Sequence, residues 1–304
     1  DTFNRVFSAL NAQCFFQCFN SWIQSIGLMV EGTVISIDGK TLRRSHDGRY
    51  DKTSLHVVSA WASDLHLSLG QVKTHEKSNE ITAIPELLNL LSIKGCIVTI
   101  DAMGCQKDIA AQIVDQKGYF VLSLKENHPD LYDDVKTYFD EAEKSKFKNS
   151  KCTTFRTIEK DHGRIEKRTV FVSNDIRWLP AKKLWKGLKS IAMVIAERTV
   201  KGEKSIERRY YITSLAPDAE VVAHAIRSHW SIENKLHWQL DVTFKEDQSR
   251  MRNKNSAENF SAIRRIALTL LKQETTKKIS MKCKRLLAGW DNMYLLKILG
   301  ITPC

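Results

Sequence analysis

Two aspartates follow short, mostly apolar runs of the sequence. Asp38 comes after VISI at 34–37, and Asp101 comes after CIVTI at 96–100. Runs of this kind that end in a polar residue and a turn signal are typical of buried strands, so each carboxylate is expected at the rim of a sheet. Ligands of open α/β sheets bind at that rim. Two carboxylates on neighbouring strands could hold a divalent metal ion, which predicts an enzyme acting on a substrate that metals activate.

A helical pattern over 218–241 supplies a third candidate. His229, Glu233, His237 and Asp241 recur every four residues and therefore line one side of the predicted helix. A polar row of this kind is most often a solvated face, but this one contains none of the Lys and Glu pairs of ordinary exposed helices. The two histidines are eight residues apart rather than four, which argues against an HExxH zinc site. We interpret Glu233 as a carboxylate directed at the sheet rim.

The elements that must position these side chains alternate between strands and helices. Strands 55–62 and 65–73 should form a hairpin. Strand 96–100, helix 107–117 and strand 119–124 follow as a parallel crossover unit. This order predicts an α/β fold with a mixed five-stranded sheet and helices on its faces. The predicted strands are 33–38, 55–62, 65–73, 96–100 and 119–124, and the predicted helices are 3–28, 81–92, 107–117 and 130–148.

After these elements the pattern becomes β-rich and basic. Residues 152–173 and 190–215 read as two hairpins, which turn at 161–163 and near Gly202. The helix that carries Glu233 follows this block. Its neighbouring stripe is largely apolar and is expected to pack on the sheet. That stripe consists of Ile226, Trp230, Leu236 and Leu240.

The net charge of +12 is unevenly distributed. Residues 1–150 carry 16 Lys and Arg against 19 Asp and Glu, whereas 151–209 carry 16 against 7 and 245–290 carry 12 against 4. Two basic segments beside a candidate metal site favour a polyanionic partner, with nucleic acid first and a membrane surface second. No apolar stretch approaches the ~18 to 20 residues that span a bilayer. The seven cysteines contain no CxxC pair, which argues against a zinc site or a disulfide framework.

Several longer strings carry a resemblance to a known family. They are ISIDGKTLRRS, LHVVSAWAS, EKSNEITAIPELL, TIDAMGCQKDIA, LKENHPDL, DHGRIEKR, IRSHWSIENKLHWQLDVTFKEDQSR and NFSAIRRIALTLLK. Together they resemble the H-repeat-associated transposases of the ISAs type, which belong to the DDE insertion-sequence transposases. The resemblance covers nearly the whole chain in order.

The resemblance implies an RNase H-like catalytic domain with a β-rich insertion before the last acidic helix. It places the catalytic and metal-binding triad on Asp38, Asp101 and Glu233. Hard cations prefer oxygen ligands, so Mg²⁺ is the expected cofactor and Mn²⁺ should substitute for it. Two such ions about 3.5 to 4 Å apart would activate the attacking oxygen and stabilise the leaving oxygen of a phosphodiester. Glu246 and Asp247 are the main competitors of Glu233 for the third position.

The residues around this triad are candidates for DNA contacts. Many transposases of the wider class carry Tyr, Arg, Glu and Lys in this order on the last acidic helix, with two, three and six other residues between successive members. With Glu233 as the Glu, this chain has Ile226, His229 and Leu240 at the other positions, so those accessory contacts do not carry over. The predicted DNA-binding residues are Lys40, Arg43, Arg44, Lys125, Asn127, Arg227, His229, His237, Arg250 and Arg252.

The expected organisation has five parts. Residues 1–30 would be the helical remnant of an N-terminal region, 31–150 the first part of the core, and 151–215 the basic insertion, whose last strand could belong to the core. Residues 216–275 would hold the core helices with the third carboxylate, and 276–304 a basic tail.

The function expected from the resemblance is Mg²⁺-dependent cleavage and strand transfer of insertion-element DNA ends. Its partners would be double-stranded DNA, as terminal inverted repeats and target, and a second copy of the chain on paired ends, with no membrane and no small-molecule cofactor. The expected location is the cytoplasm, at the nucleoid. Two alternatives stay open: an RNase H-like nuclease that cuts without joining, and an inactive DNA-binding remnant of an insertion element.

Overall fold

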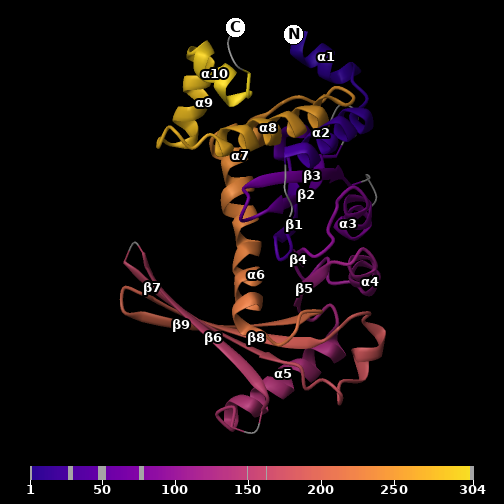
Figure 1. The fold of residues 1–304 in the computed structure, drawn as a ribbon, viewed down its shortest axis with the longest axis vertical. Coiled ribbons are helices and arrows are strands. Elements are labelled where there is room, and N and C mark those ends of the chain that lie inside the picture. The colour runs from indigo at the N-terminus through magenta and orange to yellow at the C-terminus, as the bar shows by residue number, and fades with distance from the viewer. Residues whose placement is uncertain are drawn as a thin grey trace. The chain divides into compact units, whose positions relative to one another are not determined.

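The computed structural model describes residues 2–26, 30–46, 53–74, 79–148, 150–161 and 163–301. Parts of two quoted strings, residues 76–78 and His162, lie outside this range. The chain forms two compact units: unit 1 comprises 1–29, 36–91 and 230–304, and unit 2 comprises 30–35 and 92–229. Their elements are labelled in Figure 1. In the described part of the chain, every helix is too short or too polar to span a bilayer.

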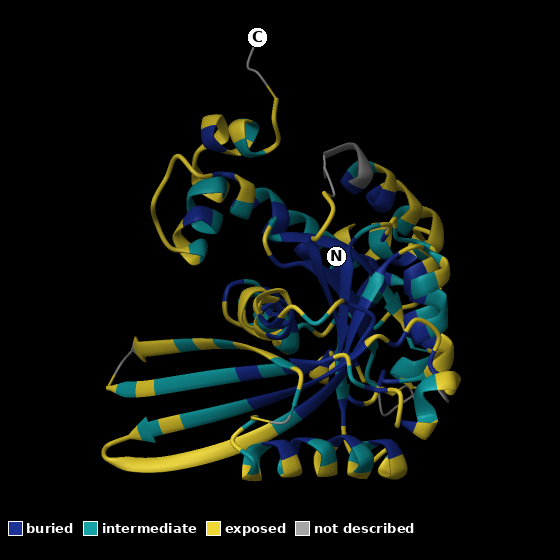
Figure 2. Ribbon diagram, turned by 60° about the horizontal axis from the view of Figure 1, so that its bottom comes forward, coloured by how far each residue is buried: buried dark blue, intermediate teal, exposed yellow. Residues whose placement is uncertain are grey.

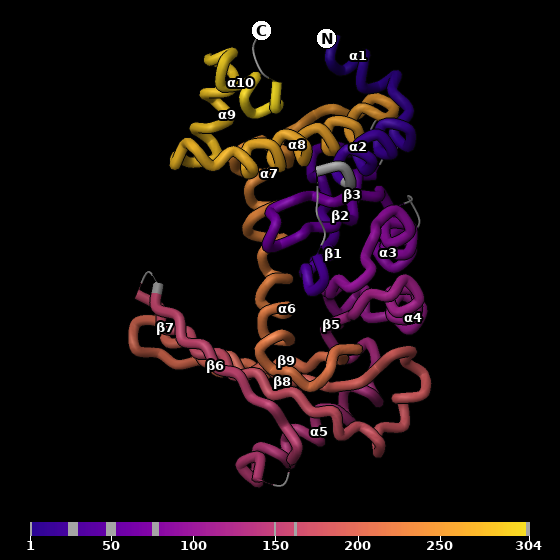
Figure 3. The backbone as a smooth tube through the Cα atoms, in the orientation of Figure 1, coloured from indigo at the N-terminus to yellow at the C-terminus, as the bar shows by residue number. Residues whose placement is uncertain are grey.

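Unit 1 contains three strands in the order β3-β2-β1 and most of the helices. Strands β2 and β3 pair antiparallel with Val58 opposite Val72, which confirms the predicted hairpin. Figure 3 shows α1 and α2 beside α8, and contacts join both helices to α8. The elements are α1 (Thr2–Ala9), α2 (Ala12–Ile26), β1 (Val34–Thr41), η1 (Arg43–Ser45), β2 (His56–Ala62), β3 (Leu67–Lys73), α3 (Glu80–Asn89), η3 (Ile232–His237), α7 (Trp238–Val242), η4 (Glu246–Gln248), α8 (Ser256–Gln273), α9 (Met281–Trp290) and α10 (Asn292–Ile298).

The N-terminal helix predicted over 3–28 is two helices rather than one. The break falls between Ala9 and Ala12. The Asn11 side chain accepts a hydrogen bond from the backbone N–H of Cys14, 3.0 Å away. A side-chain oxygen in this position satisfies one of the donors that a helix start leaves open, which favours a new helix at this point.

Unit 2 contains the strand order β1-β4-β5-β9-β8-β7-β6, in which β1 contributes its first residues. Strands β4 and β5 are parallel, whereas β9 is antiparallel to β5. The two predicted hairpins are the pairs β6–β7 and β8–β9. The mixed α/β sheet with a β-rich insertion before the acidic helix is confirmed. The elements are β4 (Ile97–Ile100), α4 (Lys107–Asp115), β5 (Tyr119–Leu124), α5 (Pro129–Lys144), β6 (Cys152–Asp161), β7 (Arg164–Ser173), η2 (Pro180–Leu184), β8 (Ser190–Val200), β9 (Glu203–Thr213) and α6 (Ala219–Ser231), whose last two residues belong to unit 1.

The sheet has more strands than the five predicted, because the insertion continues it. Thr213 and Ile212 of β9 lie opposite Val121 and Leu122 of β5. One end of the insertion is buried: α6 covers it with Val222, Ala225 and other apolar side chains. Figure 2 shows that the far ends of β6 to β9 are largely exposed or half-buried. Burial therefore ties the insertion to the sheet at one end only.

Glu197 in this exposed part of the sheet has a testable pH dependence. Hydrogen bonds from the ammonium groups of Lys167 and Lys204 lower the pKa of Glu197 from 4.5 to about 2. A carboxyl group whose pKa folding lowers stabilises the folded state above its unfolded pKa, and this contribution is lost as the pH falls through the folded pKa. We expect Glu197→Gln to lower the free energy of unfolding near neutral pH, and the difference from wild type to vanish between pH 4.5 and about 2.

Thermal unfolding across this pH range measures the difference. Glu203→Gln, on the exposed start of β9, is the matched control and should show a smaller one. A Glu197→Gln difference that stays constant down to about pH 2 would contradict the prediction.

Candidate metal and DNA site

Asp38 lies within strand β1 rather than at its end. The predicted strand ends at Asp38, but β1 runs from Val34 to Thr41. Lys40, two residues after Asp38 in the same strand, is buried and lies beside the carboxylates of Asp241, Glu246 and Asp247. Asp38 Oδ2 lies 3.6 Å from Nδ1 of His237, the last residue of η3. In unit 1, a candidate metal ligand thus lies beside one of the predicted histidines.

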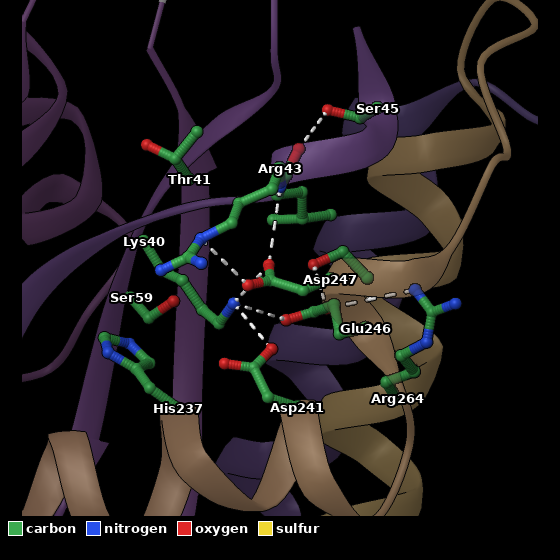
Figure 4. Close-up of polar contacts among 12 residues, drawn as sticks. Lys40, Thr41, Arg43, Ser45, Ser59, His237, Asp241, Glu246, Asp247 and Arg264 are labelled. Atoms are coloured by element: carbon green, nitrogen blue, oxygen red, sulfur yellow. Dashed lines mark hydrogen bonds and ion pairs between the residues drawn. The ribbon is translucent and has the colours of Figure 1, made fainter.

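Lys40 holds the end of β1 to the helices that follow Glu233. Its Nζ lies 2.8 Å from Asp241 Oδ1, 2.9 Å from Asp247 Oδ1 and 4.0 Å from Glu246 Oε2. Figure 4 shows these carboxylates converging on the Lys40 ammonium group. Lys40 is one of the predicted DNA-binding residues, but a phosphate would have to compete with three carboxylates for this buried cation.

Glu246 belongs to a buried ion pair. Its Oε1 accepts a hydrogen bond of 3.1 Å from Arg265 Nη1 and one of 3.0 Å from Ser261 Oγ. The side chains of Glu246 and Arg265 are both 0% exposed. Asp247, the other competitor for the third carboxylate, lies 3.3 Å from Arg43 Nε as well as beside Lys40. Both carboxylates have cationic partners, which leaves Glu233 as the preferred third carboxylate.

Glu233 occurs where the last acidic helix changes its winding. Residues Ile232–His237 form a π-helix, in which the backbone N–H of Trp238 bonds to the carbonyl of Glu233 five residues earlier. Single π-turns inside helices are frequent at functional sites. The carboxylate of Glu233 is exposed. The sequence carried no signal for the π-turn, because its pattern fits ordinary helical spacing.

The π-turn also changes which side chains are buried. Ile232, Leu236 and Leu240 are fully buried and pack with Trp61 of β2 and Leu268 of α8. The predicted apolar stripe is therefore correct for Ile226, Leu236 and Leu240, which are all buried. It is wrong for Trp230, which is 38% exposed, and it omits Ile232. Across the wide turn the buried positions Ile232, Leu236 and Leu240 are four residues apart, whereas Trp230, two residues before Ile232, lies off their side of the helix.

Asp101 lies directly after β4, as predicted. Its Oδ1 accepts hydrogen bonds from the backbone N–H groups of Met103 at 3.1 Å and Gly104 at 3.2 Å. Both bonds use the same oxygen, so they orient the carboxylate while directing Oδ2 elsewhere. The loop is tied further by Asn127, whose Nδ2 donates to the Ala102 carbonyl at 2.7 Å. Asn127 therefore supports the loop of Asp101, a role that the sequence did not reveal.

His229 contacts the strand that leads to Asp101. Its Nδ1 lies 3.1 Å from Thr99 Oγ1, two residues before Asp101. Burial lowers the pKa of His229, while the charge of Asp101 acts in the opposite direction. A neutral imidazole in this place contributes shape and hydrogen bonding to unit 2 rather than positive charge. No sequence signal marks Thr99 as a partner of His229, because threonine is common inside strands.

The remaining predicted DNA-binding residues differ in their surroundings. Arg227 pairs with Glu159 of β6 at 3.1 Å, within unit 2, and Lys125 is exposed at the end of β5. In unit 1, Arg252 Nε donates to the Arg44 carbonyl at 3.1 Å. Arg43, Arg44 and Arg250 are exposed, and Arg252 is half-buried. We call Arg43, Arg44, Arg250 and Arg252 the arginine group.

The three predicted metal ligands, Asp38, Asp101 and Glu233, are all carboxylates. Among the described residues, no three His, Cys, Asp or Glu side chains are grouped as ligands of one metal ion. The donor set of Asp38, Asp101 and Glu233 still fits a hard divalent cation, because it consists of carboxylate oxygens alone. Asp101 is held through one oxygen and Glu233 is exposed, so neither donor is enclosed in a buried ion pair like that of Glu246.

Comparison with known proteins gives consistent matches. The family described as "Transposase DDE domain" matches residues 25–270. YncI of Escherichia coli O157:H7, which is named as a transposase, is 44% identical over 99% of this chain and 77% of its own length. YhhI of E. coli K12, named as an H repeat-associated transposase, is 41% identical over 99% of this chain and 80% of its own. A cryo-EM structure of piggyBac transposase in a synaptic complex with hairpin DNA aligns with a TM-score of 0.43 and 12% identity, over 90% of this chain and 55% of that one.

Proposed function

Because the chain belongs to the family of DDE transposase domains, we propose that it cleaves the DNA ends of an insertion element and joins them to target DNA. The observation that carries this proposal is the extent of the family match, since residues 25–270 include Asp38, Asp101 and Glu233. The family generally uses divalent metal ions, and we propose Mg²⁺ for this chain, with Mn²⁺ as a substitute.

The three carboxylates would hold the metal ions. Bound there, the metal would polarise the phosphodiester and lower the pKa of the attacking water or 3′-hydroxyl group. Asp101 is oriented for this task by the backbone N–H groups of Met103 and Gly104. His237 lies beside Asp38 and would fix the direction of that carboxylate. Catalysis of phosphoryl transfer consists mainly of such positioning and of charge neutralisation.

DNA binding would come from cations that are exposed or half-buried in each unit. The arginine group follows β1 and η4 in unit 1, and Lys125 ends β5 in unit 2. Arginine and lysine side chains bind phosphate oxygens and fix the register of a duplex without reading its sequence. We propose double-stranded element ends and target DNA as partners, a homodimer that holds two ends, and a location at the nucleoid in the cytoplasm.

A strand-transfer assay on DNA that carries element ends tests the function and its metal dependence. With Mg²⁺ or Mn²⁺, we expect end cleavage followed by joining to a target plasmid. Removal of divalent ions by EDTA should abolish both steps, because carboxylates alone supply no electrophile, and added Mg²⁺ should restore them. Mg²⁺-dependent nicking without joining would support a nuclease instead. DNA binding without any cleavage in either metal would support an inactive remnant.

A further inference from the structure

A chain of hydrogen bonds ends on strand β1, three residues after Asp38. Nδ1 of His56 lies 2.7 Å from Oγ1 of Thr41, and Nε2 of His56 lies 2.8 Å from Oε1 of Glu80. Because a carboxylate only accepts hydrogen bonds, Nε2 donates to Glu80, and Nδ1 of the neutral ring accepts from the Thr41 hydroxyl group. We call Thr41, His56 and Glu80 the β1 clamp. It joins β1, β2 and α3 within unit 1.

Both partners of Thr41 are held by the elements that carry them. His56 is the first residue of β2 and Glu80 the first residue of α3, whose buried apolar side contacts the β2–β3 hairpin. The Asn79 side chain caps this helix by accepting a hydrogen bond of 3.1 Å from the backbone N–H of Ile81. The start of a helix also favours the negative charge of Glu80. The β1 clamp is therefore anchored on packed elements rather than on a loop.

Gly39, the neighbour of Asp38, provides the space for this clamp. A Cβ atom at position 39 would overlap Oε1 of Glu80 and would lie 2.5 Å from Nε2 of His56, closer than real Cβ contacts. The side chains of His56 and Glu80 are 26% and 14% exposed, so neither has much room to withdraw. Glycine inside a strand often marks such a close approach. The imidazole and the carboxylate thus pack directly against the backbone beside Asp38.

Strand β1 is held on both of its faces around Asp38. Successive residues of a strand point to opposite faces, so Asp38 and Lys40 share one face, and Gly39 and Thr41 share the other. On the first face Lys40 pairs with Asp241 at 2.8 Å. On the second face the β1 clamp holds Thr41 and covers Gly39. These contacts fix the strand on either side of the Asp38 carboxylate.

We propose that the β1 clamp positions Asp38 for DNA cleavage, with His56 and Glu80 as positioning residues. This inference rests on the proposed function and deepens it. Partners that orient metal ligands typically contribute about tenfold to a hundredfold in metal affinity or activity. A positioning role predicts slower cleavage of DNA that is already bound, without a loss of DNA affinity. A purely structural role predicts a loss of stability instead.

Single-turnover cleavage at saturating end-bearing DNA tests the proposal. With Mg²⁺, we expect Glu80→Ala to lower the cleavage rate about tenfold or more. Glu80→Gln should stay within about threefold of wild type, because the amide oxygen also accepts a hydrogen bond from Nε2 of His56. The DNA affinity of both variants in EDTA should equal that of wild type, since neither loses a cation that binds phosphate. Glu86→Ala, at an exposed position of the same helix, is the matched control.

Gly39→Ala tests the same proposal from the side of the backbone. It should lower the cleavage rate about a hundredfold or more, because a displacement of about 1 Å at a reacting site has this effect. Gly39→Ala combined with Glu80→Ala removes the overlapping carboxylate and frees the His56 ring, so it should recover most of the rate of Glu80→Ala alone. Gly289→Ala is the control, because a Cβ atom there would meet nothing within 4 Å.

Hydrogen exchange of the metal-free protein gives a readout that does not depend on activity. We expect Glu80→Ala and Gly39→Ala to speed exchange of the backbone N–H groups at 38–41, whereas both controls should exchange like wild type. Thermal unfolding verifies that each variant is folded.

Three outcomes would overturn the proposal. In the first, Glu80→Ala and Gly39→Ala cleave DNA like their controls. In the second, Glu80→Gln loses as much activity as Asp38→Asn, which would make Glu80 a metal ligand. In the third, the rate falls only in proportion to folded protein or DNA affinity. A wild-type protein that cleaves no DNA in Mg²⁺ or Mn²⁺ would instead remove the proposed function. Hydrogen exchange then decides on the clamp alone, and unchanged exchange in Glu80→Ala would overturn it.

Discussion

Replacement of Asp38, Asp101 or Glu233 by the corresponding amide should lower the rate of DNA cleavage by about a thousandfold or more. Each amide keeps the shape of the side chain but removes the negative charge that a divalent cation requires. Metal ions contribute several kcal/mol to the stabilisation of such transition states, and about 4 kcal/mol corresponds to a thousandfold change in rate. Single-turnover cleavage of end-bearing DNA measures the effect, and titration calorimetry with Mn²⁺ measures the loss of metal binding.

The matched control for this series is Glu220→Gln, an exposed carboxylate in the first turn of α6. It should cleave DNA at the wild-type rate. The three amide variants should also unfold at nearly the wild-type temperature, because they create no cavity. A variant that retains cleavage within about threefold of wild type would remove that residue from the proposed triad.

The second large effect concerns stability rather than chemistry. Glu246→Leu should lower the free energy of unfolding by about 3 to 5 kcal/mol, because it leaves the buried guanidinium group of Arg265 without its counter-ion. The same substitution removes a carboxylate from beside Lys40 and Arg264. Urea denaturation at neutral pH measures the loss.

A double variant separates the ion pair from other causes. Glu246→Leu combined with Arg265→Met replaces both charges with apolar groups and should recover much of the lost stability. Equal instability of the single and double variants would mean that packing, not the unpaired charge, causes the loss. Glu246→Gln distinguishes this structural role from catalysis, since we expect it to lower the free energy of unfolding while folded protein keeps most of its cleavage rate.

Local sequence patterns predicted the parts of the fold that local physics determines. The β2–β3 hairpin and the position of Asp101 after β4 follow from alternation of residues and from turn signals. The mixed sheet and its β-rich insertion were predicted from the order of such elements. Each of these features depends on residues that are close together in the chain.

The features that sequence did not predict depend on distant partners. Lys40 meets Asp247, 207 positions away, and these contacts bury a lysine that reads locally as part of a solvated turn. Asn127 supports the Asp101 loop through the Ala102 carbonyl, which no spacing rule indicates. The π-turn at Ile232–His237 changed the predicted exposure of Trp230 for the same reason, because packing on Trp61 and Leu268 fixes the helix phase.

The pairing of β9 with β5 has a consequence for how this protein could be shortened or recombined. An insertion whose two ends join the surrounding domain at neighbouring points can be exchanged as one unit. Here the returning strand hydrogen-bonds to β5, and Thr213 Oγ1 and Ser214 N–H both donate to the Phe120 carbonyl. Excision of 151–215 would leave β5 with an open edge, prone to pairing with other chains. Chimaeras of this unit should therefore exchange the insertion together with β5.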